Sequence, residues 1–422
     1  MAEANHDNLI YDWNLIESDE GHLRQVTFDD ETLRDGLQNP SVYNPSIREK
    51  RELVRLMDKL GIHTVNVGLP GAGDRHYDDC LDLVRCMTEE GLAIKANTAC
   101  RTLISDIEPV RRIMDETGAR VLANCFIGSS PIRQYTEGWN IDTILGHIDK
   151  SLGWARDHQV PFALVTEDTT RSKPEDIARL YRHAIDLGAE RIVVCDTCGH
   201  AMPHGTRELV RFVKSIVRET GKDVKIDWHG HRDRGMGTIN CIVAVRAGAD
   251  QVHGAAMGIG ERAGNAAMDL ILVNMKLMGW IDNDLHALDE YVHAAAKALR
   301  VEVPCNYPVF GNDAFLTGTG VHASAVIKAL KKGDDWLADR VYSGVPAGEF
   351  GRRQEIGVGP MSGRSNVLYC LHELGYDTGN EALVEHIFAI AKASPLLMRK
   401  GEVKATAEAF LAGRQAEGPA GN

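Results

Sequence analysis

The sequence lacks the features of several broad classes of protein. No apolar run approaches the ~18 residues that a membrane-spanning helix needs. The first twenty residues are polar and acidic, without the basic and apolar regions of a secretory signal. The 47 Lys and Arg against 60 Asp and Glu give a net charge of −13, with no basic stripe for nucleic acid. We therefore expect a cytoplasmic protein with no membrane or nucleic-acid partner.

Cysteine and the common nucleotide motifs are also sparse. Nine cysteines are scattered over 422 residues without a disulfide framework, which indicates a reducing compartment and buried thiols. Cys195 and Cys198 form a CxxC pattern, but they lie at the end of an expected strand, which argues against redox chemistry. The chain has no G-x-x-x-x-G-K-[ST] and no G-x-S-x-G, and its "GIGERAG" segment does not match GxGxxG. ATPase, serine hydrolase and NAD-dependent functions are therefore disfavoured.

The chain does contain a regular alternation of β-rich runs and helical stretches. Eight β-rich runs begin near Gln25, His63, Ala93, Arg120, Pro161, Arg191, Val224 and Asp250. Several of the helices between them end at a Gly, which adopts the left-handed conformation that often ends a helix. Eight strands alternating with helices predict an α/β protein with a (β/α)8 TIM barrel. An open doubly wound sheet is the alternative.

The pattern changes after Asn283, where helical segments and Gly-rich loops dominate. We therefore predict a TIM-barrel catalytic domain over residues 1–283 and a mainly helical C-terminal subdomain over residues 284–422. The second part is expected to dock on the barrel or on a second subunit.

Two histidines at the end of the seventh expected strand are the sharpest chemical feature. His229 and His231 are two residues apart, so on a strand their side chains point the same way. Asp35 follows the first strand, and the carboxyl ends of barrel strands carry the working residues. Two imidazoles and one carboxylate can share a divalent cation and leave room for substrate. The donors allow Mn²⁺, Mg²⁺ or Zn²⁺, and Asp233 is placed to orient an imidazole.

Three further polar residues lie at expected strand ends, and each has a functional and a structural interpretation. Arg34 would stabilise negative charge on an enolate or alkoxide, or it would form a surface salt bridge. Glu167 would manage protons, or it would pair with Arg171 as a structural carboxylate. Thr197 would bind a substrate carboxylate, or it would cap a helix.

Four segments together resemble the DRE-type metallolyase barrel family: "TLRDGLQ", "HGHRDRG", "GIGERAGN" and "AFLTGTGVH". The "GIGERAGN" segment is similar to the Claisen-condensing branch, which includes 2-isopropylmalate, homocitrate and citramalate synthases. The lyase branch, of the hydroxymethylglutaryl-CoA type, carries a Cys-containing loop at this place that the chain lacks. The resemblance implies condensation of acetyl-CoA with a 2-oxo acid in an acyltransferase of amino-acid biosynthesis.

The resemblance also implies roles for residues of the expected barrel. It implies a divalent cation held by Asp35, His229 and His231, with Asn265 as a further ligand. It implies that Arg34 is the catalytic arginine.

The same resemblance assigns residues beyond the cation site. It implies that Glu167 and Thr197 belong to the substrate pocket of a homodimeric enzyme. It implies that His322 enters the active site of the neighbouring subunit, and that Tyr342 is the family's catalytic tyrosine. The spacing from Tyr342 to Pro346 is one residue shorter than the usual pattern.

The chain departs from the family pattern at several pocket positions. Leu37 and Asn66 stand where the synthases carry carboxylates, and Arg133 stands where they carry a histidine. These departures remove negative charge and add positive charge, so we place Asn66 and Arg133 in the substrate-binding region. They predict an acceptor that is bulkier or more anionic at its distal end than 2-oxoisovalerate, held by Arg133 through a bidentate contact.

Two other functions stay open on the sequence alone. A metal-dependent retro-Claisen or retro-aldol lyase on the same scaffold is consistent with the "DGLQN" segment. A non-catalytic paralogue that uses the barrel for binding is consistent with the departures. Release of free CoA from acetyl-CoA in the presence of a 2-oxo acid distinguishes the condensing enzyme from both.

Overall fold

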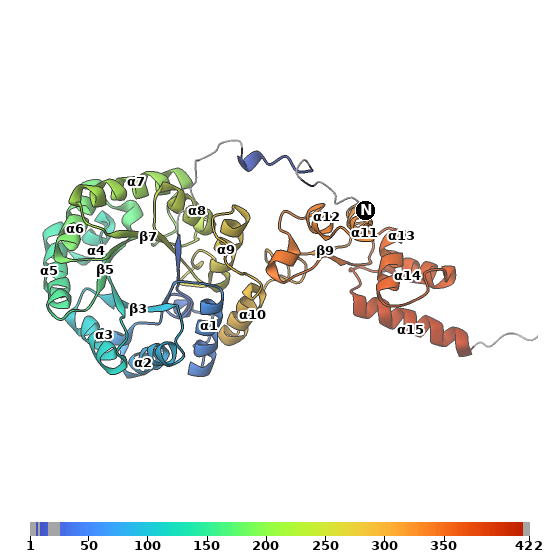
Figure 1. Ribbon diagram of the computed structural model, residues 1–422, viewed down its shortest axis with the longest axis horizontal. Helices are drawn as coiled ribbons and strands as arrows, with labels where there is room; N and C mark the ends of the chain where they lie inside the picture. The colour runs from blue at the N-terminus through green and yellow to red at the C-terminus, as the bar shows by residue number, and fades with distance from the viewer. Residues whose placement is uncertain (1–5, 7–8, 16–25, 417–422) are drawn as a thin grey trace, which may run out of the picture. The chain divides into compact units, whose positions relative to one another are not determined.

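The computed structural model describes residues 6, 9–15 and 26–416, and its centre is a closed barrel of eight parallel strands (Figure 1). The strands are β1 (Thr27–Asp30), β2 (Thr64–Asn66), β3 (Lys95–Arg101), β4 (Leu122–Gly128), β5 (Phe162–Glu167), β6 (Arg191–Asp196), β7 (Lys225–Gly230) and β8 (Gln251–Gly254). Each begins within two residues of its expected position, and β1 closes the barrel by pairing with β8. The predicted TIM barrel is therefore confirmed.

Helices alternate with these strands along the chain (Figure 1). They are α1 (Ile47–Lys59), α2 (Asp74–Glu89), α3 (Ile104–Thr117), α4 (Pro131–Glu137), α5 (Ile141–Asp157), α6 (Pro174–Leu187), α7 (Pro203–Thr220), α8 (Gly237–Ala247) and α9 (Met268–Leu277). Short 3-10 turns occur at Trp13–Leu15, Gly36–Gln38, Pro70–Ala72, Thr169–Arg171, Ala256–Gly258 and Ala347–Phe350.

Glycines end several of the barrel helices, as the sequence predicts. Gly118 after α3 and Gly188 after α6 have φ of 68° and 108°, values that side chains with a Cβ rarely adopt. Their backbone N–H groups donate to the last turns of α3 and α6, which satisfies carbonyls at the helix ends. Each following strand can therefore start within a few residues of its helix.

The chain divides into two compact units. One unit extends up to Ser41 and resumes over Gly61–Asn283, and the other consists of Val42–Leu60 and Asp284–Asn422. The helix α1 thus groups with α10 (Leu288–Leu299), against which it packs, and Lys59 and Glu290 pair across them at 3.6 Å.

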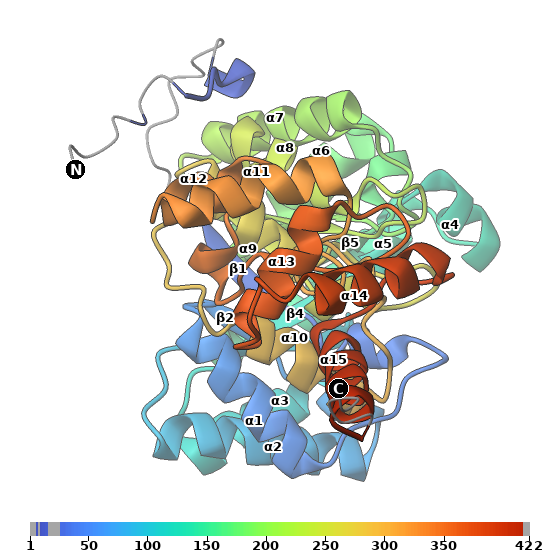
Figure 2. The same ribbon diagram turned by 90° about the vertical axis from the view of Figure 1, so that its right-hand side faces the viewer.

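The second unit is mainly helical, as predicted for this part of the chain. Its remaining elements are β9 (Leu316–Thr317), α11 (Gly320–Lys331), α12 (Asp335–Arg340), β10 (Glu355–Ile356), α13 (Arg364–Glu373), α14 (Glu381–Ala393) and α15 (Lys400–Ala416). Figure 2 shows α13, α14 and α15 beside one another. They enclose an apolar core that includes Val367, Leu371, Val384 and Ile387.

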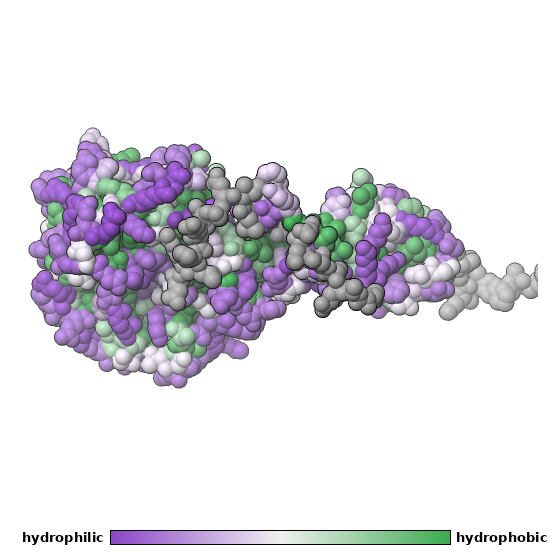
Figure 3. All heavy atoms as spheres, turned by 45° about the horizontal axis from the view of Figure 1, so that its top comes forward, coloured by the Kyte–Doolittle hydropathy of each residue, from purple (hydrophilic) through white to green (hydrophobic). Residues whose placement is uncertain are grey.

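Hydrophilic side chains cover most of the barrel surface that faces the viewer in Figure 3. Within the described residues, no helix combines the length and the apolar character needed to cross a membrane. All nine cysteines lie in the described part of the chain as free thiols, and all except Cys198 and Cys305 are buried.

Candidate metal and active site

Polar side chains converge at the carboxyl ends of the strands around a cavity of about 170 Å³. The lining residues are Glu31, Arg34, Asp35, Gln38, Asn66, Leu69, Ala99, Asn124, Phe126, Val165, Glu167, Val193, Cys195, Thr197, His229, His231, His253 and Glu261. This end of a parallel barrel is where active sites form in the fold.

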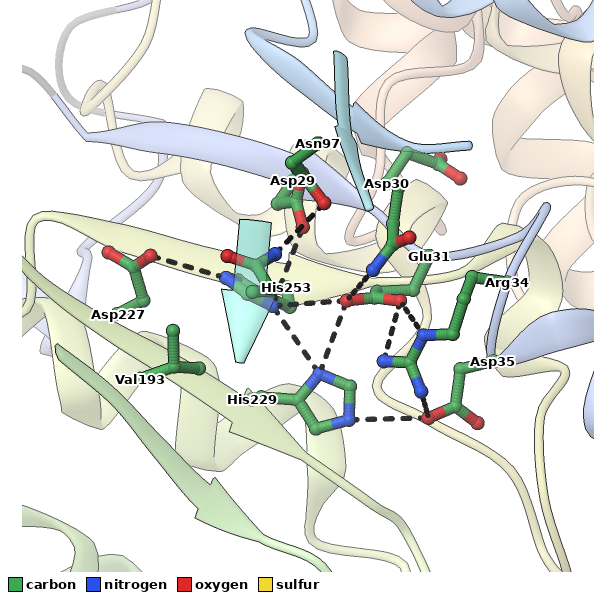
Figure 4. A network of polar contacts seen from close by, with 12 residues as sticks. Asp29, Asp30, Glu31, Arg34, Asp35, Asn97, Val193, Asp227, His229 and His253 are labelled. Carbon is green, nitrogen blue, oxygen red and sulfur yellow. Dashed lines mark hydrogen bonds and ion pairs between the residues drawn. The ribbon is translucent and has the colours of Figure 1, made fainter. Parts of the chain in front are cut away.

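Asp35, His229 and His231 come together at this cavity (Figure 4 shows the first two). The Nε2 atom of His229 lies 3.4 Å from Asp35 Oδ2 and 3.4 Å from His231 Nε2. The Nε2 atom of His231 lies 3.6 Å from Asp35 Oδ2. Three donors bound to one cation at about 2.1 Å in tetrahedral geometry would be about 3.4 Å apart. The spacing therefore fits a shared divalent cation.

Asn265, expected to be a further ligand, lies beside this group on the loop after β8. It forms an isolated bridge with His231, and its Oδ1 is buried without a hydrogen-bond partner among the described residues. A buried acceptor without a partner is costly, and a cation nearby would satisfy it. A Cβ on Gly260 would meet both Asn265 Nδ2 at 2.7 Å and Asp35 Oδ1 at 3.0 Å, so both side chains lie against this glycine.

The protonation states also suit a cation. Burial would raise the pKa of Asp35, but Arg34 and the two histidines hold it well below its usual range. Burial lowers the pKa of His231 to about 4 against the opposing effect of Asp35. An ionised carboxylate and a neutral imidazole are the forms that bind metal. The residues present therefore fit a divalent cation.

Arg34 is held inside the site and does not form a surface salt bridge. Its side chain is 19% exposed and lies 2.7 Å from Glu31 Oε2 and 3.1 Å from Asp35 Oδ2 (Figure 4). The Nε atom also donates a hydrogen bond to Glu31 Oε2 at 2.8 Å. The guanidinium is thus fixed next to the candidate metal ligand.

Glu167 lines the cavity and is not paired with Arg171. Arg171 instead forms two 2.7 Å hydrogen bonds with Asp168. Burial raises the pKa of Glu167, although Arg133 and Arg34 oppose this effect. Thr197 also lines the cavity, and its hydroxyl accepts a 2.8 Å hydrogen bond from the Asp168 backbone N–H.

Asn66 and Arg133, the two residues that depart from the family pattern and were assigned to substrate binding, differ in their surroundings. Asn66 lines the cavity and donates through Nδ2 to Glu31 Oε1 at 3.4 Å. Arg133 is on α4, pairs with Glu137 at 3.1 Å, and is not among the described residues that line the cavity. It still lies near enough to Glu167 to lower the pKa of that carboxyl group.

His322 and Tyr342 both lie in the second unit and contact each other. Their rings stack with centroids 4.2 Å apart and an interplanar angle of 27°. Asp233, expected to orient an imidazole, accepts a 2.9 Å hydrogen bond from Arg262.

Sequence reasoning missed Glu31 and His253, which line the cavity and are 2% and 3% exposed. With His229 they form a second group of close donor atoms. The sequence did contain a signal for both residues, because side chains alternate along a strand and polar ones at its carboxyl end can face the barrel interior. Glu31 directly follows β1, and His253 lies within β8. The pairing of β1, β7 and β8, which brings them together, is not visible in the sequence.

Comparisons with known proteins identify the family of the chain. The HMGL-like family model matches residues 25–295. A homocitrate synthase of Methanopyrus kandleri is 32% identical over 87% of this chain and 87% of its own length. A 2-isopropylmalate synthase of Sulfolobus acidocaldarius is 30% identical, with coverages of 88% and 92%. These relatives are synthases, as the sequence motifs predict.

The fold is also shared with solved structures. The hydroxymethylglutaryl-CoA lyase of Pseudomonas aeruginosa superposes with a TM-score of 0.53 and 20% identity, covering 65% of this chain and 92% of the lyase. On the matching family model and the similarity to the synthases, this chain belongs to the HMGL-like family of TIM-barrel proteins.

Proposed function

We propose that this chain catalyses the metal-dependent condensation of acetyl-CoA with a 2-oxo acid, after which water hydrolyses the thioester and a 2-hydroxy-2-carboxymethyl acid and CoA are released. The observation that carries the proposal is the group of Asp35, His229 and His231 beside Arg34 at the cavity. The names of the homocitrate and 2-isopropylmalate synthases support the same reaction class.

Asp35, His229, His231 and Asn265 would hold the divalent cation. When bound, the cation supplies Lewis-acid polarisation of the carbonyl group of the 2-oxo acid. The guanidinium of Arg34, fixed by Glu31, stabilises negative charge that develops on the ketone oxygen.

The proton chemistry is assigned to Glu167. The methyl group of a thioester is a weak carbon acid, so a base has to act close to it. Glu167 faces the cavity, and burial raises its pKa, which brings it closer to the range in which a carboxylate is an effective base. Asn66 and Thr197 line the same cavity and would contact the 2-oxo acid.

We also propose that the second unit completes the site in a homodimer. His322 and Tyr342 are stacked together, so they can act as one group in proton transfer. We propose an anionic acceptor, because Asn66 in the cavity adds no negative charge and Arg133 on α4 places a positive charge near Glu167.

The test is a thiol-release assay with acetyl-CoA and a panel of 2-oxo acids, combined with metal analysis. We expect the wild-type protein to bind about one cation per chain and to release CoA with one or more acceptors. Asp35→Asn and His229→Ala should lose both the bound cation and turnover. His76→Ala, an exposed histidine on α2, is the control and should keep both. Full activity of a metal-free His229→Ala variant would contradict the proposal.

A further inference from the structure

The proposed cation site uses one side of His229, and the other side faces a second set of buried groups. The Nε2 atom is directed at Asp35 and His231. The Nδ1 atom lies 3.7 Å from Glu31 Oε1 and 3.4 Å from His253 Nδ1. A histidine that gives Nε2 to a cation carries its hydrogen on Nδ1, so this hydrogen needs an acceptor.

Glu31 is the acidic residue that the backbone places beside this nitrogen, with Oε1 at 3.7 Å. Its N–H donates to the Gly254 carbonyl at 2.8 Å, which extends the pairing of β1 with β8 by one residue. Glu31 is two residues beyond Asp29, so the two side chains point to the same side, into the barrel. Figure 4 shows the Glu31 carboxylate between the His229 and His253 rings and Arg34.

The two carboxylate oxygens of Glu31 serve different partners. Oε2 accepts a 2.8 Å hydrogen bond from Arg34 Nε and forms a 2.7 Å ion pair with Arg34 Nη2. Oε1 faces the Nδ1 atoms of His229 and His253 and also accepts from Asn66 at 3.4 Å. One carboxylate therefore connects the arginine at the cavity with a ligand of the cation.

His253 fixes Glu31 from behind. Its Nδ1 is 3.4 Å from Glu31 Oε1, and its Nε2 is 3.5 Å from Asp227 Oδ2. Asp227 is itself held by two hydrogen bonds from Arg191, of 2.5 and 2.7 Å. The network thus continues through the barrel interior to Arg191 at the start of β6, and it restricts how far the Glu31 carboxylate can turn.

We infer that Glu31 is a positioning residue that aligns both Arg34 and His229, one through each carboxylate oxygen. The inference rests on the proposed function, because the alignment matters only if His229 binds the cation and Arg34 acts on the substrate. A second cation held by Glu31, His229 and His253 is the rival explanation of this cluster. Arg34 and Asn66 already engage Glu31, and His229 would have to lose its remaining ring hydrogen, so alignment is favoured.

The inference predicts two separable effects of Glu31→Ala. Loss of the Oε1 contact should weaken Mn²⁺ binding about 10- to 100-fold, as for other residues that orient metal-bound histidines. Loss of the Oε2 contact should lower kcat more than it changes KM, because Arg34 is no longer held. In Arg34→Ala protein the added Glu31→Ala change should have little further effect on kcat and the full effect on Mn²⁺ affinity.

Two other variants sharpen the test. Glu31→Gln has one acceptor oxygen, which can face either Arg34 or His229. The variant should therefore retain either the kcat or the Mn²⁺ affinity but not both. Asp106→Asn changes a buried carboxylate outside this network, which accepts two hydrogen bonds from the Arg101 side chain, and it should leave Mn²⁺ affinity and kcat within about threefold of wild type.

Two measurements distinguish the alignment of Arg34 and His229 from a second cation. They are the affinity for Mn²⁺ in the absence of substrates and the number of cations bound by the saturated protein. Unchanged Mn²⁺ affinity in Glu31→Ala would overturn the inference and leave the proposed function standing. The inference would also be overturned if each wild-type chain bound two cations and Glu31→Ala lost one of them, because the cluster would then hold a second cation. A wild-type protein that binds Mn²⁺ but never releases CoA would overturn the proposed function. The Mn²⁺ affinities of the variants would still test whether Glu31 aligns His229.

Discussion

At the scale of single residues, the cavity contains a carboxyl group whose ionisation should be visible in the pH dependence of turnover. Burial raises the pKa of Glu167, so this group stays protonated to a higher pH than an ordinary glutamate. A base acts only in its ionised form. Turnover should therefore fall as the pH decreases through the raised pKa.

Glu167→Gln should lower kcat about 10²- to 10⁴-fold and remove this acidic limb from the profile of kcat against pH. Arg133→Ala provides the matched comparison, since its positive charge lowers the pKa of Glu167. Its removal should move the limb to higher pH without abolishing turnover. A limb that is unchanged in Glu167→Gln would assign it to another group.

At the scale of elements, the loop after β8 carries Asn265 by a backbone path that only glycine allows. Gly264 has a φ of 103°, and a Cβ there would fall on the carbonyl oxygen of Gly258. Gly264→Ala should therefore displace the loop, destabilise the protein by about 1–2 kcal/mol and weaken cation binding about tenfold. Thermal unfolding and Mn²⁺ titration measure the two effects.

Gly146→Ala is the control for this substitution. Gly146 lies within α5, and a Cβ at this position meets open space. Alanine should stabilise the helix by about 0.5–1 kcal/mol without changing cation affinity. Equal cation affinities of the Gly264→Ala and wild-type proteins would show that the loop does not position a ligand.

At the scale of the whole molecule, the proposed dimer can be tested by mixing two inactive variants. Asp35→Asn removes a candidate ligand from the barrel, and His322→Ala removes a candidate proton-transfer group from the second unit. If His322 acts in the neighbouring subunit, mixed dimers contain one intact site. Random mixing of equal amounts should then recover about one quarter of the wild-type rate.

If the subunits exchange and the mixture still shows no activity, His322 acts in the site of its own chain or lies outside any site. Mass measurement of the intact protein confirms that mixed dimers have formed. The same measurement tests whether the protein is a homodimer.

The alternation of strands and helices in the sequence was enough to predict the barrel. The strands of this barrel are short and mostly buried, and several of the helices between them end at a glycine, so the pattern is local and can be recognised in the sequence. The pairing of His229 with His231 was readable for the same reason, because the two residues share one strand direction. Asp35 could be added because barrel sites collect at the carboxyl ends of strands.

Only the tertiary structure decided what surrounds these residues. His229 and His253 follow Glu31 by about two hundred residues in the sequence, and the three meet because β1 closes the barrel between β2 and β8. The register of this closure sets which side chains share the interior. Burial and charge then determine the pKa of each group, as for Asp35 and Glu167. Composition and motif spacing contain neither register nor burial, so these features appear only when the chain is folded.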